Sequence, residues 1–150
     1  MVASFAILAL ISIAVVAVVR HTLVVVTVHG PSMEPSLHDG ERLLARRATA
    51  HLPAVGELVV FAPLMENGQP VPASMPASGR LWLVKRLVAG PGDPVPPGLG
   101  PALSAVAGQP VPAGHMVVVG DNGAESVDSR QEGFVAVDRV RAVVVRRLVS

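Results

Sequence analysis

The chain has 150 residues, of which 51% are apolar and only 3% aromatic, so it is long enough for one modest domain with a core of valine, leucine and alanine. A net charge of +1, without a basic patch interleaved with aromatic residues, excludes a typical nucleic-acid-binding domain. The absence of cysteine excludes thiol catalysis and disulfide bonds, and the five scattered histidines lack metal-ligand spacing, so neither a metal nor another cofactor is expected.

The first long feature is an uncharged apolar stretch from Val2 to Val19, interrupted only by serines. As a helix it would rise about 27 Å, close to the ~30 Å hydrocarbon core of a bilayer. A cleaved secretory signal would need a basic start and a small-x-small cleavage site. A buried core helix is the second alternative, and it is less favoured because the stretch is apolar on every face. The stretch therefore predicts an uncleaved membrane anchor over residues 2–19. Arg20 follows it and nothing basic precedes it, so charge leaves the orientation of the anchor open.

Beyond the anchor, apolar runs rich in β-branched residues predict an all-β domain over residues 22–150. The expected strands lie at residues 22–28, 41–47, 56–61, 80–89, 115–119 and within 134–148. Segments rich in proline, glycine and polar residues predict an exposed loop over 65–79, an irregular connection over 94–114 and a polar loop over 120–133. No helix is predicted outside the anchor.

Directly after the first strand, the stretch from Gly30 to Asp39 places Ser32 between Pro31 and Pro35. Each proline fixes its own φ and pushes the preceding residue out of the helical region, so a stiff and extended backbone is expected around Ser32. Such a backbone suits a residue that presents one hydroxyl at a fixed angle. A serine hydroxyl is a poor nucleophile until a base removes its proton, and the chain must supply that base.

Lys85 is the only lysine among the 12 basic residues of the chain. Arginine keeps its proton in a protein, whereas a buried lysine can lose it, so a solitary lysine suggests a base. The composition of a GC-rich genome also makes lysine scarce, and the count alone leaves both explanations open. In the strand over 80–89, Lys85 shares a face with Leu81, Leu83 and Leu87, which would desolvate its amine and lower its pKa. A lysine at a sheet edge with its amine in water is the alternative that periodicity leaves open.

Four blocks now stand in order behind the apolar stretch, and together they resemble the type I signal peptidases, membrane-anchored Ser/Lys proteases that remove signal peptides from exported proteins. The blocks are Ser32-Met-Glu-Pro-Ser-Leu37, Gly56-Glu-Leu-Val-Val-Phe61, Lys85-Arg-Leu-Val-Ala-Gly-Pro-Gly-Asp93 and Gly120-Asp-Asn122 continuing to Gly133. They span nearly the whole chain beyond the anchor. The resemblance favours the chemical explanation of Lys85.

Carried over by position, the resemblance implies that Ser32 is the acyl-forming nucleophile and Lys85 the general base, with Ser126 orienting the lysine amine by a hydrogen bond. The Ser32 backbone N–H is the implied oxyanion donor. Some members add a serine hydroxyl two residues before the nucleophile, where this chain has Gly30, so the second donor is left open.

The same resemblance implies that residues of the polar loop hold the geometry of the site by ion pairing. These are Asp121, Asp128 and Arg130, and Arg86 is a further candidate.

The resemblance also implies a fold and a location: an all-β catalytic domain behind a single N-terminal transmembrane helix, in the plasma membrane, with the catalytic domain on the extracytoplasmic side. The 94–114 connection is too short for the additional β-domain of larger members, so a minimal catalytic core is expected. The implied partners are signal-peptide-bearing precursors, with small residues at the first and third positions before the cut, and membrane lipid. No nucleic acid is expected.

The sequence leaves three alternatives to this function. A Ser-His-Asp hydrolase is disfavoured because Ser32 is not in a Gly-x-Ser-x-Gly elbow and no histidine stands out as its partner. The small size permits a dedicated maturation protease for one precursor, such as that of nickel-type superoxide dismutase. A catalytically inactive, membrane-anchored binding protein is the third alternative, against which the retention of both Ser32 and Lys85 argues.

Overall fold

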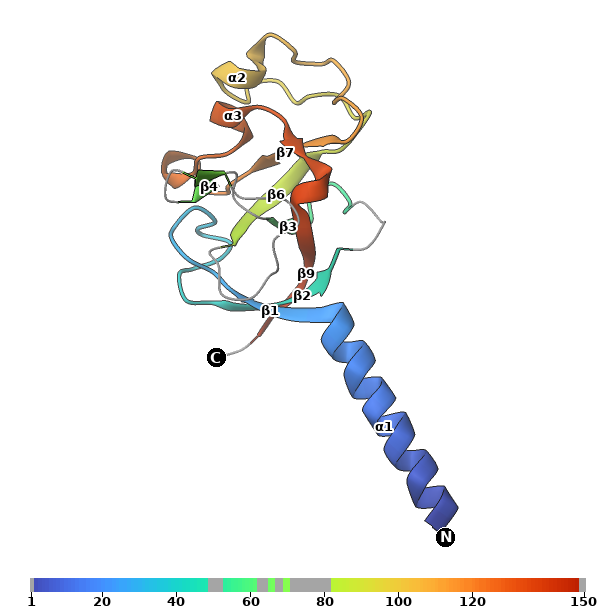
Figure 1. Cartoon of the computed structure of the whole chain (residues 1–150). Coiled ribbons are helices and arrows are strands. Elements are labelled where there is room, and N and C mark those ends of the chain that lie inside the picture. Colours follow the sequence, from blue (N-terminus) through green and yellow to red (C-terminus); the bar gives the residue numbers. More distant parts are fainter. Residues whose placement is uncertain (1, 49–52, 62–64, 67–68, 71–81, 149–150) are drawn as a thin grey trace.

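The computed structural model describes residues 2–48, 53–61, 65–66, 69–70 and 82–148. Helix α1 (Val2–Thr22) projects from a β domain, which it enters directly at strand β1 (Leu23–Thr27) (Figure 1). The helix expected over residues 2–19 is therefore present and continues to Thr22, so the predicted first strand begins one residue later. The side chains described in α1 are exposed along its length. Within the described residues, no helix is both long and apolar enough to cross a membrane.

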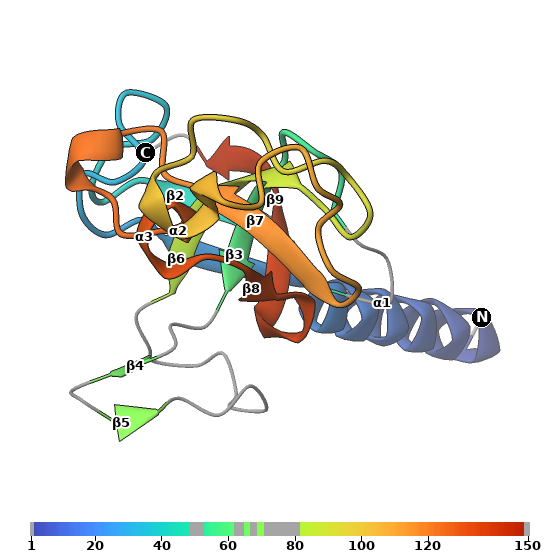
Figure 2. The same cartoon turned by 90° about the horizontal axis from the view of Figure 1, so that it is seen from above.

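In the described part of the chain, seven strands form one antiparallel sheet in the order β1-β2-β9-β3-β6-β7-β8. After β1, these strands are β2 (Arg42–Arg47), β3 (Leu58–Phe61), β6 (Leu83–Ala89), β7 (His115–Val119), β8 (Val135–Ala136) and β9 (Val140–Leu148). The pair β4 (Met65–Glu66) and β5 (Gln69–Pro70) is set apart from the main sheet (Figure 2). The predicted all-β domain is confirmed in its antiparallel sheet, although short helices also occur, as described below.

Buried side chains of the described residues form three clusters, and these determine which residues reach the site. The first cluster lies between β1, β2 and the Ser32 segment, and includes Met33 and Leu37. The second lies on the Lys85 side of the sheet and includes Val59, Phe61 and Leu87. Valine dominates these clusters because β-branched side chains pack well on a pleated sheet.

The third cluster corrects the expectation of an irregular 94–114 connection, because Val95, Leu103 and Val111 are buried together against β7. This connection contains the short helix α2 (Pro101–Ser104), which begins with proline, a residue suited to a first helical turn. It also packs tightly on the polar loop: a Cβ on Gly100 would lie 2.7 Å from the Arg130 carbonyl oxygen.

The expectation of no helix outside the anchor is wrong. Besides α2, the described part of the domain contains α3 (Ser129–Glu132) and two 3₁₀ turns, η1 (Gly123–Glu125) and η2 (Val137–Arg139). Helix α3 forms because Asp128 and Gln131 make a reciprocal capping box at its first turn. These helices are too short to produce a helical periodicity of apolar residues.

Part of the predicted loop and strand lies outside the described residues. The loop expected over 65–79 is described only where β4 pairs with β5. The first residues of the strand expected over 80–89, including Leu81, also lie outside the described part of the chain.

Candidate active site

Ser32 lies in a hydrogen-bonded turn. The Glu34 N–H donates to the Pro31 carbonyl at 3.0 Å, and the Leu37 N–H donates to the Met33 carbonyl at 2.9 Å. The expected extended backbone is therefore wrong: the φ that proline imposes also suits a turn. Ser32 is half-buried, while the next residue, Met33, is buried in the first cluster together with Leu37. The turn thus holds the Ser32 hydroxyl at the surface by anchoring the neighbouring side chains below it.

The start of the polar loop packs directly on this turn. The Asn122 N–H donates to the Ser32 carbonyl at 3.1 Å, and the Asn122 side-chain amide donates to the Pro31 carbonyl at 3.2 Å. Gly120 lies so close that a Cβ would be 2.5 Å from the Ser32 carbonyl oxygen and would collide with Ser126 Oγ. Only glycine permits this approach of the backbones.

A bidentate ion pair joins β6 to the same loop. Arg86 donates to both carboxylate oxygens of Asp121, at 2.9 and 2.6 Å, and to the Gly56 carbonyl at 2.8 Å. The hydrogen bond from Arg86 is the main cause that lowers the pKa of Asp121, and a hydrogen bond from the Ser36 side chain contributes. Arg86, expected as a further ion-pair residue, therefore links β6 and the Ser32 turn through Asp121.

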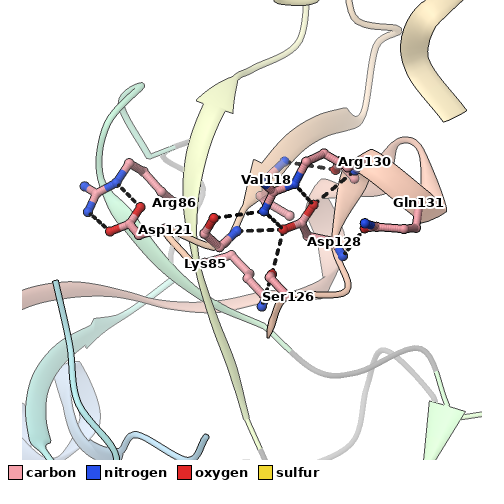
Figure 3. Close-up of polar contacts among 10 residues, drawn as sticks. Lys85, Arg86, Val118, Asp121, Ser126, Asp128, Arg130 and Gln131 are labelled. Carbon is pink, nitrogen blue, oxygen red and sulfur yellow. Dashed lines mark hydrogen bonds and ion pairs between the residues drawn. The ribbon is translucent and has the colours of Figure 1, made fainter. Parts of the chain in front are cut away.

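Lys85 points to the opposite side of β6 from Arg86 (Figure 3). It pairs across the sheet with Val59 and lies on the face of Leu83 and Leu87, as the strand period predicts. The side chain is 3% exposed, which excludes the sheet-edge alternative. Burial lowers the pKa of the Lys85 amine, whereas the nearby Asp128 charge acts in the opposite direction.

The Lys85 amine is held by a polar chain that runs through the polar loop (Figure 3). Lys85 Nζ donates to Ser126 Oγ at 2.7 Å, and Ser126 Oγ donates to Asp128 Oδ2 at 2.6 Å. The Gly120 N–H donates to the same carboxylate oxygen at 2.8 Å. Arg130 completes the chain with side-chain hydrogen bonds to both Asp128 oxygens, at 2.9 and 2.6 Å.

The hydrogen bonds to Asp128 keep this buried carboxyl group ionised. Burial acts to raise its pKa, but hydrogen bonds from Arg130, the Gly120 N–H and Ser126 outweigh burial and lower the pKa to about 2. An ionised carboxylate can only accept hydrogen bonds. The Ser126 hydroxyl must therefore point its hydrogen at Asp128, which turns a lone pair of Ser126 Oγ towards Lys85.

Ser32 and Lys85 line one open cleft of about 410 Å³. Phe61, Leu83 and Val127 give the cleft apolar walls, and its polar lining includes His29, Glu125 and Glu132. Among the contacts of the described residues, no hydrogen bond joins the Ser32 hydroxyl directly to the Lys85 amine. Catalytic hydrogen bonds often form only once substrate is bound, so sharing the cleft is the relevant geometry.

The backbone at Gly30 bears on the identity of the second oxyanion donor, which the sequence left open. Gly30 has φ +82°, and its N–H donates to Asp39 Oδ1 at 2.8 Å. The Gly30 N–H is therefore committed and cannot serve as the second oxyanion donor.

Two features of the site escaped sequence reasoning. Gly120 and Ser36 stand in the quoted blocks, but their roles depend on contacts between segments far apart in the chain.

Within the described residues, no group of three or more histidine or acidic side chains could hold a metal ion.

Comparison with known proteins matches residues 2–97 and 100–149 to the family described as signal peptidase, peptidase S26. The chain is 29% identical over 129 residues to mitochondrial inner membrane protease subunit 1 of Schizosaccharomyces pombe, covering 79% of this chain and 69% of that protein. It is 31% identical over 140 residues to signal peptidase I T of Bacillus subtilis, covering 75% and 67% respectively.

Proposed function

We propose that the chain, which belongs to the S26 family of signal peptidases, cleaves its substrates with Ser32 as nucleophile and Lys85 as general base. Family membership and the named relatives make it a membrane-bound serine endopeptidase that removes signal peptides. The single observation that carries the residue assignment is the buried Lys85–Ser126–Asp128 chain, which lies in the same cleft as Ser32.

The direction of the hydrogen bonds in this chain suits a base. Ser126 donates to Asp128 and so accepts one N–H of Lys85. A neutral amine then keeps its lone pair free to accept the proton of the Ser32 hydroxyl, and burial favours the neutral amine.

In the proposed reaction, Ser32 Oγ attacks the scissile carbonyl as its proton passes to Lys85 Nζ. The Ser32 backbone N–H stabilises the oxyanion of the tetrahedral intermediate. The Lys85 ammonium then protonates the leaving amine as the peptide bond breaks, which leaves an ester on Ser32. Water, deprotonated by Lys85, hydrolyses the ester and restores both groups.

We assign α1 the role of a single membrane-spanning anchor, with the catalytic domain on the extracytoplasmic side of the plasma membrane. The uncharged apolar stretch over residues 2–19 and the exposure of its described side chains support this assignment. Alkaline extraction of cell membranes should leave the full chain in the pellet, and protease added outside intact spheroplasts should digest the domain. A freely soluble full chain would refute the anchor.

The catalytic assignment is tested with the purified full chain in detergent and a signal-peptide-bearing precursor, with cut sites read by mass spectrometry. Ser32→Ala, Lys85→Ala and Lys85→Arg should each abolish cleavage, the last because a guanidinium keeps its proton. Ser104→Ala, an exposed serine on α2, is the matched control and should cleave normally. Turnover by Ser32→Ala above the level of a mock purification would refute the assignment.

A further inference from the structure

The cleft at Ser32 offers few hydrogen-bond donors to an oxyanion. Among the described residues that line it, three side chains carry an N–H or O–H group, namely His29, Ser32 and Lys85. The carboxylates of Glu125 and Glu132 can only accept hydrogen bonds, and the other described lining residues have no polar side chain. Ser32 and Lys85 exchange a proton in the proposed reaction. His29 is therefore the described side-chain donor of the cleft that this reaction leaves without a role.

The backbone just before Ser32 cannot supply a second donor. Pro31 has no N–H, and the Gly30 N–H already donates to Asp39 Oδ1. The φ of Gly30, +82°, lies in the left-handed region that strains a residue with a side chain, so a hydroxyl donor at this position would be unfavourable. Of residues 30–32, only Ser32 thus has a backbone N–H left for the oxyanion. Oxyanion holes combine backbone N–H groups with side chains, histidine included, so we expect a second donor elsewhere in the cleft.

His29 reaches the cleft because the end of β1 keeps the alternation of a strand. β1 ends at Thr27, but the Val28 N–H still donates to the Glu41 carbonyl at 2.8 Å. The Val28 side chain is buried in the first cluster, and the next side chain, His29, faces away from that cluster. His29 is exposed and lines the cleft. In the described part of the chain, no hydrogen bond or ion pair occupies the His29 ring, so the ring is available to a substrate.

We propose that the His29 imidazole donates a hydrogen bond to the scissile carbonyl oxygen as this oxygen becomes an oxyanion, together with the Ser32 backbone N–H. This inference rests on the proposed function, in which Ser32 is the nucleophile. A neutral imidazole carries one N–H and a protonated imidazole carries two, so the ring can donate in either form. The contact forms once a peptide occupies the cleft, as catalytic hydrogen bonds often do.

Two other roles for His29 lead to different expectations. A general base must accept a proton, and an amide side chain cannot replace it, whereas an amide N–H can replace a donor. A contact with the bound substrate that is equally strong in the ground state and the transition state would change KM and leave kcat unaltered. An oxyanion donor acts in the transition state, so its removal lowers kcat.

The first test measures kcat and KM of the purified full chain in detergent for a short signal-peptide substrate. His29→Ala should lower kcat by roughly a hundred- to a thousandfold, with KM nearly unchanged. His29→Phe keeps a ring without an N–H and should be equally slow. His29→Gln and His29→Asn place an amide N–H near the two ring nitrogens, and at least one of them should regain about tenfold or more over His29→Ala. His21→Ala removes an exposed histidine from the last turn of α1, outside the cleft, and should cleave normally.

The second test compares the affinity of a peptide aldehyde with that of the corresponding peptide alcohol. Ser32 Oγ adds to the aldehyde carbon while its proton passes to Lys85 Nζ, and the carbonyl oxygen becomes the oxyanion of a hemiacetal. The alcohol has no carbonyl group at this position and cannot add. The parent chain should therefore bind the aldehyde more tightly, and His29→Ala should lower this preference by roughly a hundredfold without weakening the alcohol. Ser32→Ala should abolish the preference. Thermal unfolding of each variant should match that of the parent chain, because His29 is exposed.

The role of His29 is overturned if His29→Ala has normal kcat, or if neither amide variant exceeds His29→Ala, which would indicate a base. It is also overturned if His29→Ala keeps the full preference for the aldehyde while Ser32→Ala abolishes it, and this outcome leaves the proposed function intact. If the parent chain binds both ligands equally, or if Ser32→Ala keeps the preference, Ser32 is not the nucleophile and both proposals fail.

Discussion

Gly120→Ala adds one methyl group where the polar loop meets the Ser32 turn. The new Cβ would lie 2.5 Å from the Ser32 carbonyl oxygen and would collide with Ser126 Oγ. Ordinary van der Waals contact begins at 3.4 Å, so one of the two segments must move by roughly 0.9 Å, and a misplacement of about 1 Å costs on the order of a hundredfold in rate. Overpacking of this kind also destabilises a fold by about 1–3 kcal/mol.

The measurement is kcat and KM for a short peptide substrate, together with thermal unfolding of the same preparation. We expect kcat to fall by about a hundredfold while the variant still unfolds cooperatively. Gly90→Ala is the matched control, because its Cβ would lie 3.4 Å from the Asp93 carboxylate. A Gly120→Ala enzyme with normal kcat would show that the contact between Gly120 and the Ser32 turn does not set the geometry of the site.

Four further outcomes follow from the same site. kcat/KM should rise with pH through the pKa of Lys85, which burial places below the ordinary 10.5, and an ascending limb at 10.5 or above would contradict this. Because burial in the folded state opposes protonation of the Lys85 amine, Lys85 lowers the free energy of unfolding below pH 10.5, and this penalty fades as the pH rises. Lys85→Met should therefore be inactive, yet at least as stable as the parent chain in thermal unfolding at neutral pH. Ser126→Ala should lower kcat by about ten- to a thousandfold, or 1.4–4 kcal/mol, and normal kinetics would exclude an orienting role. Because the pKa of Asp128 is lowered from 3.8 to about 2, its ionisation should contribute about 2 kcal/mol to the free energy of unfolding above pH 4, and this contribution should disappear as the pH falls towards 2. In Asp128→Asn, the free energy of unfolding measured over this pH range should lack that decrease.

Sequence patterns that depend on neighbouring residues predicted most of the fold. The β-branched runs gave the strand positions to within a few residues, and the two-residue period correctly placed Lys85 on the face of Leu83 and Leu87. Both follow from local geometry and the burial of one sheet face, which a single chain expresses directly.

The errors lie where contacts between distant segments decide the conformation. The turn at Ser32 is stabilised by the burial of Met33 and Leu37 and by Asn122, a residue far along the chain. The short helices depend on a capping box and on packing, and they leave no periodic signal. The tight approach of Gly120 could not be predicted for the same reason: its partners Ser32 and Ser126 meet only in the folded domain.

The arrangement of charges limits how far Asp128 opposes the effect of burial on the pKa of the proposed base. Burial has the largest effect on the pKa of Lys85 and lowers it, whereas the Asp128 charge raises this pKa and the Arg130 charge lowers it. Arg130 pairs with Asp128 and lies near enough to Lys85 to offset part of the effect of the Asp128 charge on the Lys85 amine. Asp128 can therefore stay ionised and orient Ser126 while burial keeps the pKa of Lys85 lowered. Arg130 thus serves the proposed mechanism by partly offsetting the Asp128 charge, which orients Ser126 but raises the pKa of Lys85.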